Sequence, residues 1–268
     1  MNTFDHTGVG FIIGGGSGIG EATADTLASR GWRVAVGDRD LPAAQRVASR
    51  LAETGAQSIA LPVDITDTGS VDDATAAAAK EWGQLDAVIP CAGIIAPSPS
   101  EDIEDDALFG MIDIHLLGTI RAVRAAFPYL KQSSNPSIIA LSSVAAHMGL
   151  PHRLSYAAAK GGVEAVVKTL AVEWAAYGIR ANAVAPGWVR TPMIKRAVAE
   201  GRLDITTLEH LSPLERLAEP IEIAEAIAFL ASSGSGYVTG TTLMVDGALT
   251  IKGPWPQGVV PPTASQSD

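Results

Sequence analysis

Short apolar, β-branched runs alternate along the chain with longer amphipathic or alanine-rich runs. Each short run is apolar on both faces and is bounded by Gly, Asp or Pro, which is typical of strands buried on both sides of a parallel sheet. The pattern predicts strands over residues 9–13, 33–38, 58–64, 85–90, 137–143, 180–186 and 241–246. It predicts helices over residues 18–30, 41–54, 68–82, 105–131, 155–177 and 220–232.

Strands that alternate with helices predict a single α/β domain over residues 1–252, a Rossmann-type doubly wound sheet of about seven parallel strands flanked by helices. Residues 190–219 lack a strand and follow the carboxyl end of one, where ligands of such sheets lie, so we expect a substrate lid there. A plain surface excursion is the alternative. Residues 253–268 are rich in Pro, Ser and Gly and predict an irregular tail.

Composition narrows the class of protein. The chain has 268 residues, 47% of them hydrophobic, and a formal net charge of −10, which predicts a globular protein and disfavours nucleic-acid binding. Cys91 is the only cysteine, which excludes an intramolecular disulfide and a cysteine-based metal cluster. There is no basic n-region at the start and no apolar stretch of 18 residues, so we expect a cytoplasmic protein without a membrane partner.

A glycine-rich turn lies between the first predicted strand and helix, in "FIIGGGSGIGEATA" at residues 11–24. The spacing Gly14-x-x-x-Gly18-x-Gly20 puts glycines where the backbone turns tightly and where helix and strand nearly touch. The free N–H groups of such a turn and the helix N-terminus suit a pyrophosphate. A merely flexible turn is the alternative, and the acid that ends the second strand argues against it.

That acid is Asp38, which lies 18 residues beyond Gly20, close to the interval of the dinucleotide fingerprint. A carboxylate here accepts hydrogen bonds from the adenosine ribose and repels a 2′-phosphate, so NAD is favoured over NADP. The neighbouring Arg39 is a counter-argument, because it could turn toward a phosphate. Asp38 could instead cap the second helix, although Asp40 is better placed for that role.

The stretch "YAAAK" places Tyr156 and Lys160 on one helix face, one turn apart. A buried ring with a snorkelling amine would give the same pattern. With this pair included, the chain resembles the short-chain dehydrogenase/reductase family over residues 8–250. The resemblance is carried by "GGGSGIG" (14–20), "CAG" (91–93), a serine 13 residues before the tyrosine, "YAAAK" (156–160), "NAVAPGWVRTPM" (182–193) and "YVTGTTLMVDG" (237–247).

The resemblance implies an NAD(H)-dependent oxidoreductase acting on a secondary alcohol or ketone. Tyr156 would be the general base in oxidation and the acid in reduction, and Lys160 would lower its pKa and hold the nicotinamide ribose. Ser143 would hydrogen-bond the substrate oxygen. The candidates for the pocket wall are mostly apolar and favour a mid-sized apolar or cyclic substrate: Val144, Ala145, His147, Met148, Leu150, His152, Trp188, Met193 and Ile194.

Further cofactor contacts follow from the same resemblance. Asp64 would contact the adenine amino group and Ile65 would border its ring. Val189 and Thr191 would hold the carboxamide. The remaining implied positions are Ser17 and Ile19 of the glycine loop, the backbone of Cys91, Ala92 and Gly93, and the turn formed by Pro186 and Gly187. No metal site is expected.

Three residues depart from the family pattern. Ile13 replaces a threonine before the first glycine, and Pro90 replaces an asparagine and removes a ladder donor. His115 replaces an asparagine whose carbonyl holds a water that links the lysine to solvent. A relay through the His115 carbonyl is our preferred interpretation, provided that the helix kinks there, and a packed histidine is the alternative.

Relatives of this kind are usually homotetramers built through long helices such as 105–131 and 155–177, so we expect a homotetramer. Two rival functions stay open. One is an NADPH-dependent reductase of 3-oxoacyl thioesters, against which Asp38 argues. The other is a dinucleotide-sensing protein without catalysis, against which Ser143, Tyr156 and Lys160 argue.

Overall fold

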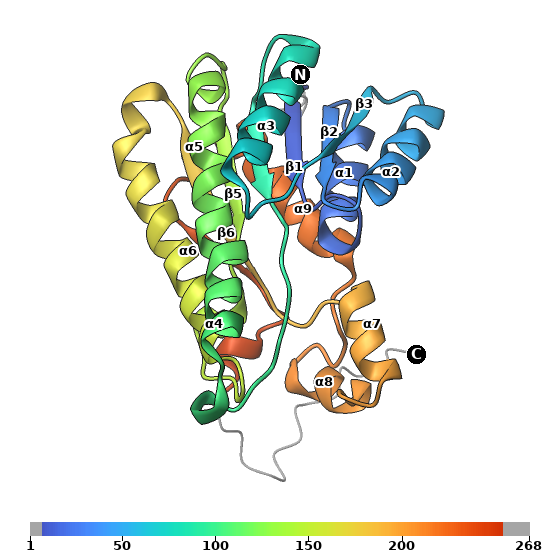
Figure 1. Cartoon of the computed structure of the whole chain (residues 1–268), viewed down its shortest axis with the longest axis vertical. Helices are drawn as coiled ribbons and strands as arrows, with labels where there is room; N and C mark the ends of the chain where they lie inside the picture. Colours follow the sequence, from blue (N-terminus) through green and yellow to red (C-terminus); the bar gives the residue numbers. More distant parts are fainter. Residues whose placement is uncertain (1–6, 254–268) are drawn as a thin grey trace, which may run out of the picture.

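The computed structural model describes residues 7–253. One sheet of seven parallel strands runs through it in the order β3-β2-β1-β4-β5-β6-β7 (Figure 1). The predicted Rossmann-type sheet is therefore confirmed, and several strands are a few residues shorter than the pattern predicts. The strands are β1 Val9–Ile13, β2 Arg33–Asp38, β3 Ser58–Pro62, β4 Ala87–Pro90, β5 Ser137–Leu141, β6 Arg180–Pro186 and β7 Thr242–Val245.

Helices cover both faces of the sheet, which explains why the strands are apolar on both sides. In β1, Phe11 packs into the cluster beneath one helix layer and Ile12 into the cluster beneath the other, and both side chains are fully buried. One layer consists of α1 Gly18–Ser29, α2 Leu41–Glu53 and α9 Pro220–Ala231. The other consists of α3 Thr68–Trp82, α5 Gly118–Leu130 and α6 Leu154–Glu173.

Local signals set the ends of these helices. Glycines at positions 31, 55, 83 and 178 lie just after helical segments, and all four have the positive φ that is common at the end of a helix. Asp40 caps α2 by accepting from the Ala43 N–H at 3.2 Å, which confirms that it is better placed than Asp38 for this role. Short 3₁₀ turns occupy Ser100–Asp102, Val144–Ala146, Ala175–Tyr177, Ser233–Ser235 and Leu249–Ile251.

The strand order reverses between β1 and β4. β1 and β4 are neighbours in the sheet, and the strand that follows β1 lies on one side of this pair whereas the strand that follows β4 lies on the other. The crevice beyond the carboxyl ends of strands at such a point is the usual ligand site of doubly wound sheets.

The helix predicted over residues 105–131 is interrupted. It consists of α4 Asp105–Ile112, a π-helical turn at Asp113–Leu117 and α5, and the Gly118 N–H donates to the Asp113 carbonyl five residues back. A Cβ on Gly118 would lie 2.8 Å from the Ile65 side chain. The backbone just after the π-turn therefore lies close to the loop that follows β3. Single π-turns occur often at functional sites.

Residues 190–219 contain two helices that the sequence pattern did not resolve, α7 Pro192–Ala199 and α8 Ile205–Leu211. They extend from the carboxyl-terminal side of the sheet (Figure 1). Ile194, Leu208 and Leu217 form a small hydrophobic cluster of their own, with Trp188 packed against it. The segment is thus a folded unit beside the strand ends, and its role as a lid stays a prediction.

Within residues 7–253 no helix is long and apolar enough to cross a membrane. The expected irregular tail lies, apart from residue 253, outside the described residues. The cytoplasmic location and the homotetramer stay predictions.

Candidate active site

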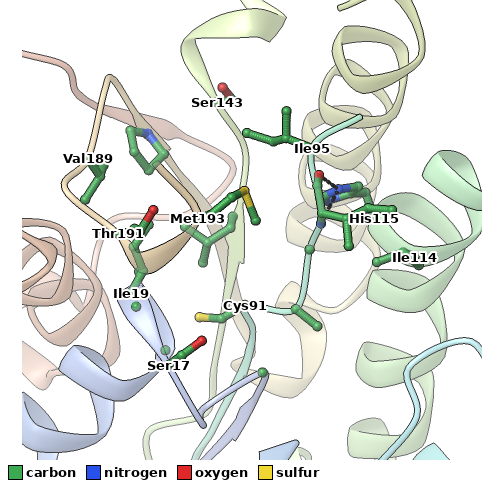
Figure 2. A pocket seen from close by; sticks show the side chains of 18 of the residues that line it. Ser17, Ile19, Cys91, Ile95, Ile114, His115, Ser143, Val189, Thr191 and Met193 are labelled. Atoms are coloured by element: carbon green, nitrogen blue, oxygen red, sulfur yellow. Dashed lines mark hydrogen bonds between the residues drawn. The ribbon is translucent and has the colours of Figure 1, made fainter. Parts of the chain in front are cut away.

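A cleft of about 430 Å³ lies at the carboxyl ends of the strands, where the order reverses, and Figure 2 shows part of its wall. This volume is within the usual range for a small-molecule site. All the residues predicted to bind the cofactor line this cleft: Gly14, Ser17, Gly18, Ile19, Gly20, Asp38, Asp64, Ile65, Cys91, Ala92, Gly93, Tyr156, Lys160, Pro186, Gly187, Val189 and Thr191.

The glycine loop fits closely against its surroundings. A Cβ on Gly20 would lie 2.1 Å from the Gly14 carbonyl oxygen, and one on Gly14 would lie 2.5 Å from the Ala92 nitrogen. Gly14 also has φ +88, which L side chains rarely adopt. Ser17 occupies the N-cap position of α1, but its exposed hydroxyl accepts no hydrogen bond from the N–H groups of the first turn. The first turn of α1 therefore has the open N–H groups that a pyrophosphate requires.

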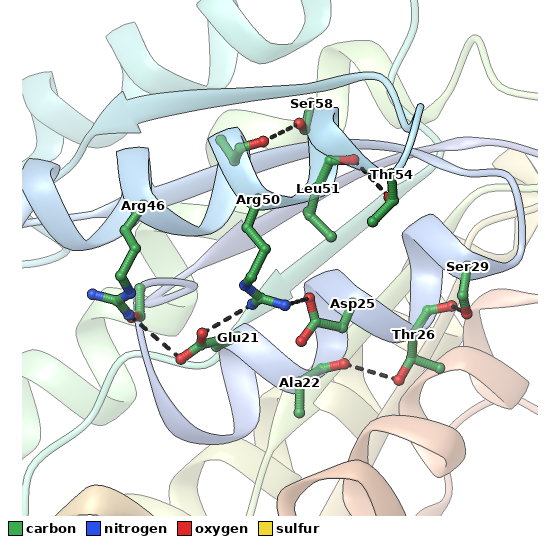
Figure 3. A network of polar contacts seen from close by, with 12 residues as sticks. Glu21, Ala22, Asp25, Thr26, Ser29, Arg46, Arg50, Leu51, Thr54 and Ser58 are labelled. Atoms are coloured by element: carbon green, nitrogen blue, oxygen red, sulfur yellow. Dashed lines mark hydrogen bonds and ion pairs between the residues drawn. The ribbon is translucent and has the colours of Figure 1, made fainter.

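Arginines of α2 hold this loop from the outside (Figure 3). Arg46 donates to the Gly16 carbonyl at 2.7 Å. Arg50 forms ion pairs with Asp25 at 2.8 Å and Glu21 at 2.9 Å, and thereby joins α2 to α1. The loop and the first turn of α1 are thus fastened to the next helix.

Asp38 ends β2 and faces the loop. One of its carboxylate oxygens accepts from the Gly16 N–H at 2.9 Å and the other from the Asp40 N–H at 3.0 Å. Its orientation is therefore fixed, and each oxygen retains a further lone pair for a ligand. The exposed Arg39 lines the same end of the cleft.

Asp64 and Ile65 follow β3 at the same end. The Asp64 carboxylate accepts from the Thr66 hydroxyl at 2.7 Å and from the Thr66 N–H at 2.9 Å. These hydrogen bonds lower the pKa of Asp64. Asp64 is consequently a fixed anionic acceptor, as contact with an adenine amino group requires.

Tyr156 and Lys160 lie on α6 and face the cleft together with Ser143, which follows β5. The buried Lys160 Nζ lies 5.6 Å from the centroid of the Tyr156 ring and donates to the Leu141 carbonyl at 2.6 Å. Burial lowers the pKa of Lys160 to about 8. The alternative of a snorkelling amine at the surface is wrong, because Lys160 is only 5% exposed.

The electrostatics of Tyr156 differ from the expectation. Burial raises its pKa, and only the hydrogen bond with Ser143 and the charge of Arg153 act in the opposite direction. Lys160 is not among the groups that lower this pKa in the structure, and its ammonium donates to the Leu141 carbonyl. Tyr156 is thus a protonated phenol at neutral pH, and its activation by Lys160 stays a prediction.

His115 lies in the π-turn, buried against the loop after β4. Its Nε2 lies 2.8 Å from the Ile94 carbonyl oxygen, drawn as a dashed line in Figure 2, and its ring meets Tyr156 edge-on at 5.2 Å. Burial lowers its pKa to about 3, so the imidazole is neutral. Its carbonyl accepts from the Thr119 hydroxyl at 2.7 Å. The helix irregularity on which the relay depends is therefore present, and the relay itself stays a prediction.

Only part of the expected substrate wall lines the cleft. Val144, Leu150, Trp188, Met193 and Ile194 line the cleft, whereas Ala145, His147, Met148 and His152 do not. Ala145 is buried behind the wall, where its N–H donates to the Ser143 hydroxyl at 3.2 Å. His147 turns away to the buried Glu164, with 2.7 Å between Nε2 and Oε1. Residues 145–152 belong to no strand or α-helix, so their spacing in the sequence could not predict which side chains face the cleft.

The wall residues that the sequence analysis did not name include Ile94, Ile95 and Arg153. The isoleucines follow "CAG" directly, so the motif could have indicated them. Arg153 precedes Tyr156 by three residues, a helical spacing that could have pointed to it. Cys91 is inert as a nucleophile, because burial raises the pKa of its thiol to about 12.

The sheet and its carboxyl-end cleft define a Rossmann-type α/β protein, and comparison with known proteins identifies its family. A family model described as enoyl-(acyl carrier protein) reductase matches residues 14–250. A cis-4-hydroxycyclohexanecarboxylate dehydrogenase of Sinomonas cyclohexanicum is 39% identical over 243 residues, which are 90% of this chain and 96% of that protein. The chain belongs to the short-chain dehydrogenase/reductase family.

Two further relatives agree with this assignment. A glucose 1-dehydrogenase of Gluconobacter oxydans (strain 621H) is 38% identical over 244 residues, or 90% of this chain and 91% of that protein. The crystal structure of a short-chain type dehydrogenase/reductase from Mycobacterium marinum is 29% identical, with a TM-score of 0.88 over 94% of this chain and 99% of that chain. Dehydrogenases of this family use nicotinamide dinucleotide cofactors.

Proposed function

We propose that this protein is an NAD(H)-dependent dehydrogenase of a secondary alcohol, or reductase of the matching ketone, acting on a mid-sized and mainly apolar, cyclic substrate. The observation that carries the proposal is the position of Tyr156, which lines the cleft together with Ser143 and lies beside the buried Lys160. The named dehydrogenase relatives support a reaction at a CH–OH group.

The chain's own residues suit the proton half of this reaction. A nicotinamide, when bound, takes up or supplies the hydride at carbon. Tyr156 moves the proton at the substrate oxygen, and the Ser143 hydroxyl donates to that oxygen as charge develops on it. Lys160 would hold the cofactor ribose with its ammonium. Because burial raises the pKa of Tyr156, the phenol is ready as an acid for reduction, and oxidation becomes faster as the pH rises.

NAD is favoured over NADP by Asp38. Its carboxylate is fixed at the edge of the cleft by the Gly16 and Asp40 N–H groups and would meet the ribose hydroxyls of the adenosine. A 2′-phosphate would bring negative charge against it. Arg39 is exposed and could partly offset that repulsion.

The substrate class rests on the wall of the cleft beyond the catalytic residues. Val144, Leu150, Met193, Ile194 and Ile95 give this end an apolar lining. The cyclohexane ring in the name of the Sinomonas relative supports a cyclic substrate. The Gluconobacter relative favours a sugar as the second candidate, although an apolar wall would leave most hydroxyls of a sugar without partners.

A substrate panel with NAD and NADP in separate reactions tests the proposal. It contains cyclohexanols, hydroxycyclohexanecarboxylates, linear secondary alcohols, glucose, threitol and a 3-oxoacyl thioester, with Tyr156→Phe as the inactive control. We expect turnover of the cyclic alcohols with NAD. Turnover of the thioester alone, with NADPH, would refute the proposal in favour of a 3-oxoacyl thioester reductase. Turnover of the polyols alone would refute it in favour of a polyol dehydrogenase. Binding of NADH without turnover of any member would favour a dinucleotide-sensing protein.

A further inference from the structure

Arg153 brings a positive charge into the substrate end of the cleft. It immediately precedes α6 and lies three residues before Tyr156, and both residues line the same cleft. Its side chain is partly buried, and its positive charge partly opposes the rise that burial causes in the pKa of Tyr156. The guanidinium is therefore close to the position where the substrate reacts.

No carboxylate of residues 7–253 pairs with this guanidinium. Its hydrogen-bond partner among them is the His152 carbonyl, 3.2 Å from Nη1, which occupies one of five N–H donors. By contrast, Arg50, Arg190 and Arg216 all form ion pairs with acidic side chains on the protein surface. Arg153 thus retains most of its donors and its full charge for a ligand.

The surroundings of Arg153 make an anionic ligand the fitting partner. The neighbouring wall is apolar, formed by residues such as Val144, Leu150 and Met193, and it cannot satisfy the donors. A partly desolvated guanidinium without hydrogen-bond partners is energetically unfavourable. A carboxylate can accept two hydrogen bonds from its planar set of N–H donors. The acidic residues that line the cleft are Asp38, which ends β2, and Asp64, which follows β3. Both strands lie on the other side of β1 from β5, which Ser143 follows.

We propose that Arg153 binds the carboxylate of the substrate, so that the preferred substrates are hydroxy acids and their keto acids. The carboxylate and the reacting hydroxyl are then separated by an apolar body that fits between Arg153 and Tyr156. This inference rests on the proposed function, because it concerns the substrate of the same site. The apolar lining alone indicates an uncharged substrate, whereas Arg153 indicates a substrate that also carries a carboxylate.

The kinetic test compares an acid with its uncharged ester. The probes are the cis and trans isomers of 4-hydroxycyclohexanecarboxylate and of its methyl ester, with NAD. In Arg153→Gln we expect kcat/KM for the turned-over acid to fall about 10- to 100-fold, mainly through KM, because a charged hydrogen-bonded pair is lost. The ester should change by less than about threefold, and Arg153→Lys should restore part of the loss.

A matched control removes charge without touching the cleft. Arg196 lies exposed on α7 and is not among the residues that line the cleft, so Arg196→Gln makes the same change in net charge. It should leave both substrates unaffected. The NADH dissociation constant, measured by fluorescence, should be unchanged in Arg153→Gln.

Three results would overturn the proposal. An equal loss for acid and ester, with a shifted pH profile of kcat, would mean that Arg153 acts on Tyr156. A weaker binding of NADH would assign the guanidinium to the cofactor. A wild-type protein that shows no preference for the acid, together with an unaffected Arg153→Gln, would leave no carboxylate site.

A binding experiment separates this proposal from the proposed function. Calorimetry of the NADH-loaded protein with cyclohexanecarboxylate, which carries no reacting hydroxyl, should show binding that Arg153→Gln weakens about 10- to 100-fold. Cyclohexanecarboxamide is the neutral control. If no substrate is turned over, the proposed function fails while this comparison still decides the carboxylate site. If the acid and the amide bind equally, the carboxylate site fails whatever the turnover.

Discussion

Replacing Asp38 by alanine tests the choice of cofactor. The structure fixes this carboxylate between the Gly16 N–H at 2.9 Å and the Asp40 N–H at 3.0 Å, at the edge of the cleft. If it accepts from the adenosine ribose, Asp38→Ala removes hydrogen bonds to a charged acceptor, each worth about 1.5–3 kcal/mol. The affinity for NAD should therefore fall about 10- to 100-fold.

The same change should improve the binding of NADP. Two unit charges about 4 Å apart repel each other by about 1 kcal/mol in water and about 4 kcal/mol near a protein surface. Asp38→Ala removes this repulsion and leaves the exposed Arg39 at the same end of the cleft to pair with a 2′-phosphate. Together the two effects should shift the ratio of NAD to NADP affinity by about 100-fold or more.

Asp40→Ala is the matched control, because it removes the same charge two residues away. Asp40 caps α2, so this variant should lose about 0.5–2 kcal/mol of unfolding free energy and keep the cofactor ratio of the wild type. The assay is the quenching of tryptophan fluorescence by NADH and NADPH, with kcat/KM for both cofactors where turnover is found. An equal fall in both affinities would refute the argument, since Asp38 would then only shape the glycine loop.

Three further changes test the catalytic centre. His115→Ala should lower the turnover rate at least about tenfold and leave NAD affinity little changed; equal loss of both, or of neither, in kinetics and binding assays rules out the relay. Lys160→Met should abolish turnover yet raise the unfolding free energy at pH 7 by up to about 3 kcal/mol, because the folded-state pKa of about 8 lies below the ordinary 10.5. This gain should shrink between pH 8 and 10.5 in urea titrations, and a variant less stable at pH 7 would contradict it. Glu164→Ala removes the acceptor of Ser142 at 2.5 Å and of His147 at 2.7 Å, and should cost about 1–3 kcal/mol in urea unfolding, whereas an unchanged stability would show that both groups find other partners.

The strands, the glycine loop and the positions around the cleft could be predicted because they follow from short-range patterns. A parallel strand is apolar on both faces, and the residues that follow such strands meet at one edge of the sheet. Gly14 and Gly20 are specified by the same turn, since neither position has room for a Cβ. The local sequence therefore contains what is needed to place these groups.

The π-turn at His115 and the direction of Arg153 depend on contacts between distant segments. The His115 ring fills the space beside Gly93, where a Cβ would lie 2.4 Å from the ring, and neither residue alone indicates this fit. Arg153 follows His152, whose φ of +61 is uncommon for a residue with a side chain. A left-handed residue just before the helix changes the direction of the next side chains, and no spacing rule reports it.

The pKa shifts in the site point to a division of roles that residue types alone do not give. Burial lowers the pKa of Lys160 to about 8 and that of His115 to about 3, and raises that of Tyr156. At neutral pH the cleft therefore holds a neutral imidazole, a protonated phenol and an ammonium that releases its proton more readily than usual. Groups whose pKa values differ in this way suit proton transfer, because one group can donate a proton at a pH at which its neighbour cannot.

In this arrangement Tyr156 is prepared to give a proton to a carbonyl oxygen, and removal of the same proton requires added positive charge nearby. Arg153 supplies such charge from the substrate side only until a carboxylate neutralises it. An anionic substrate should consequently leave the pKa of Tyr156 higher than a neutral one does, and shift the alkaline rise of the oxidation rate to higher pH.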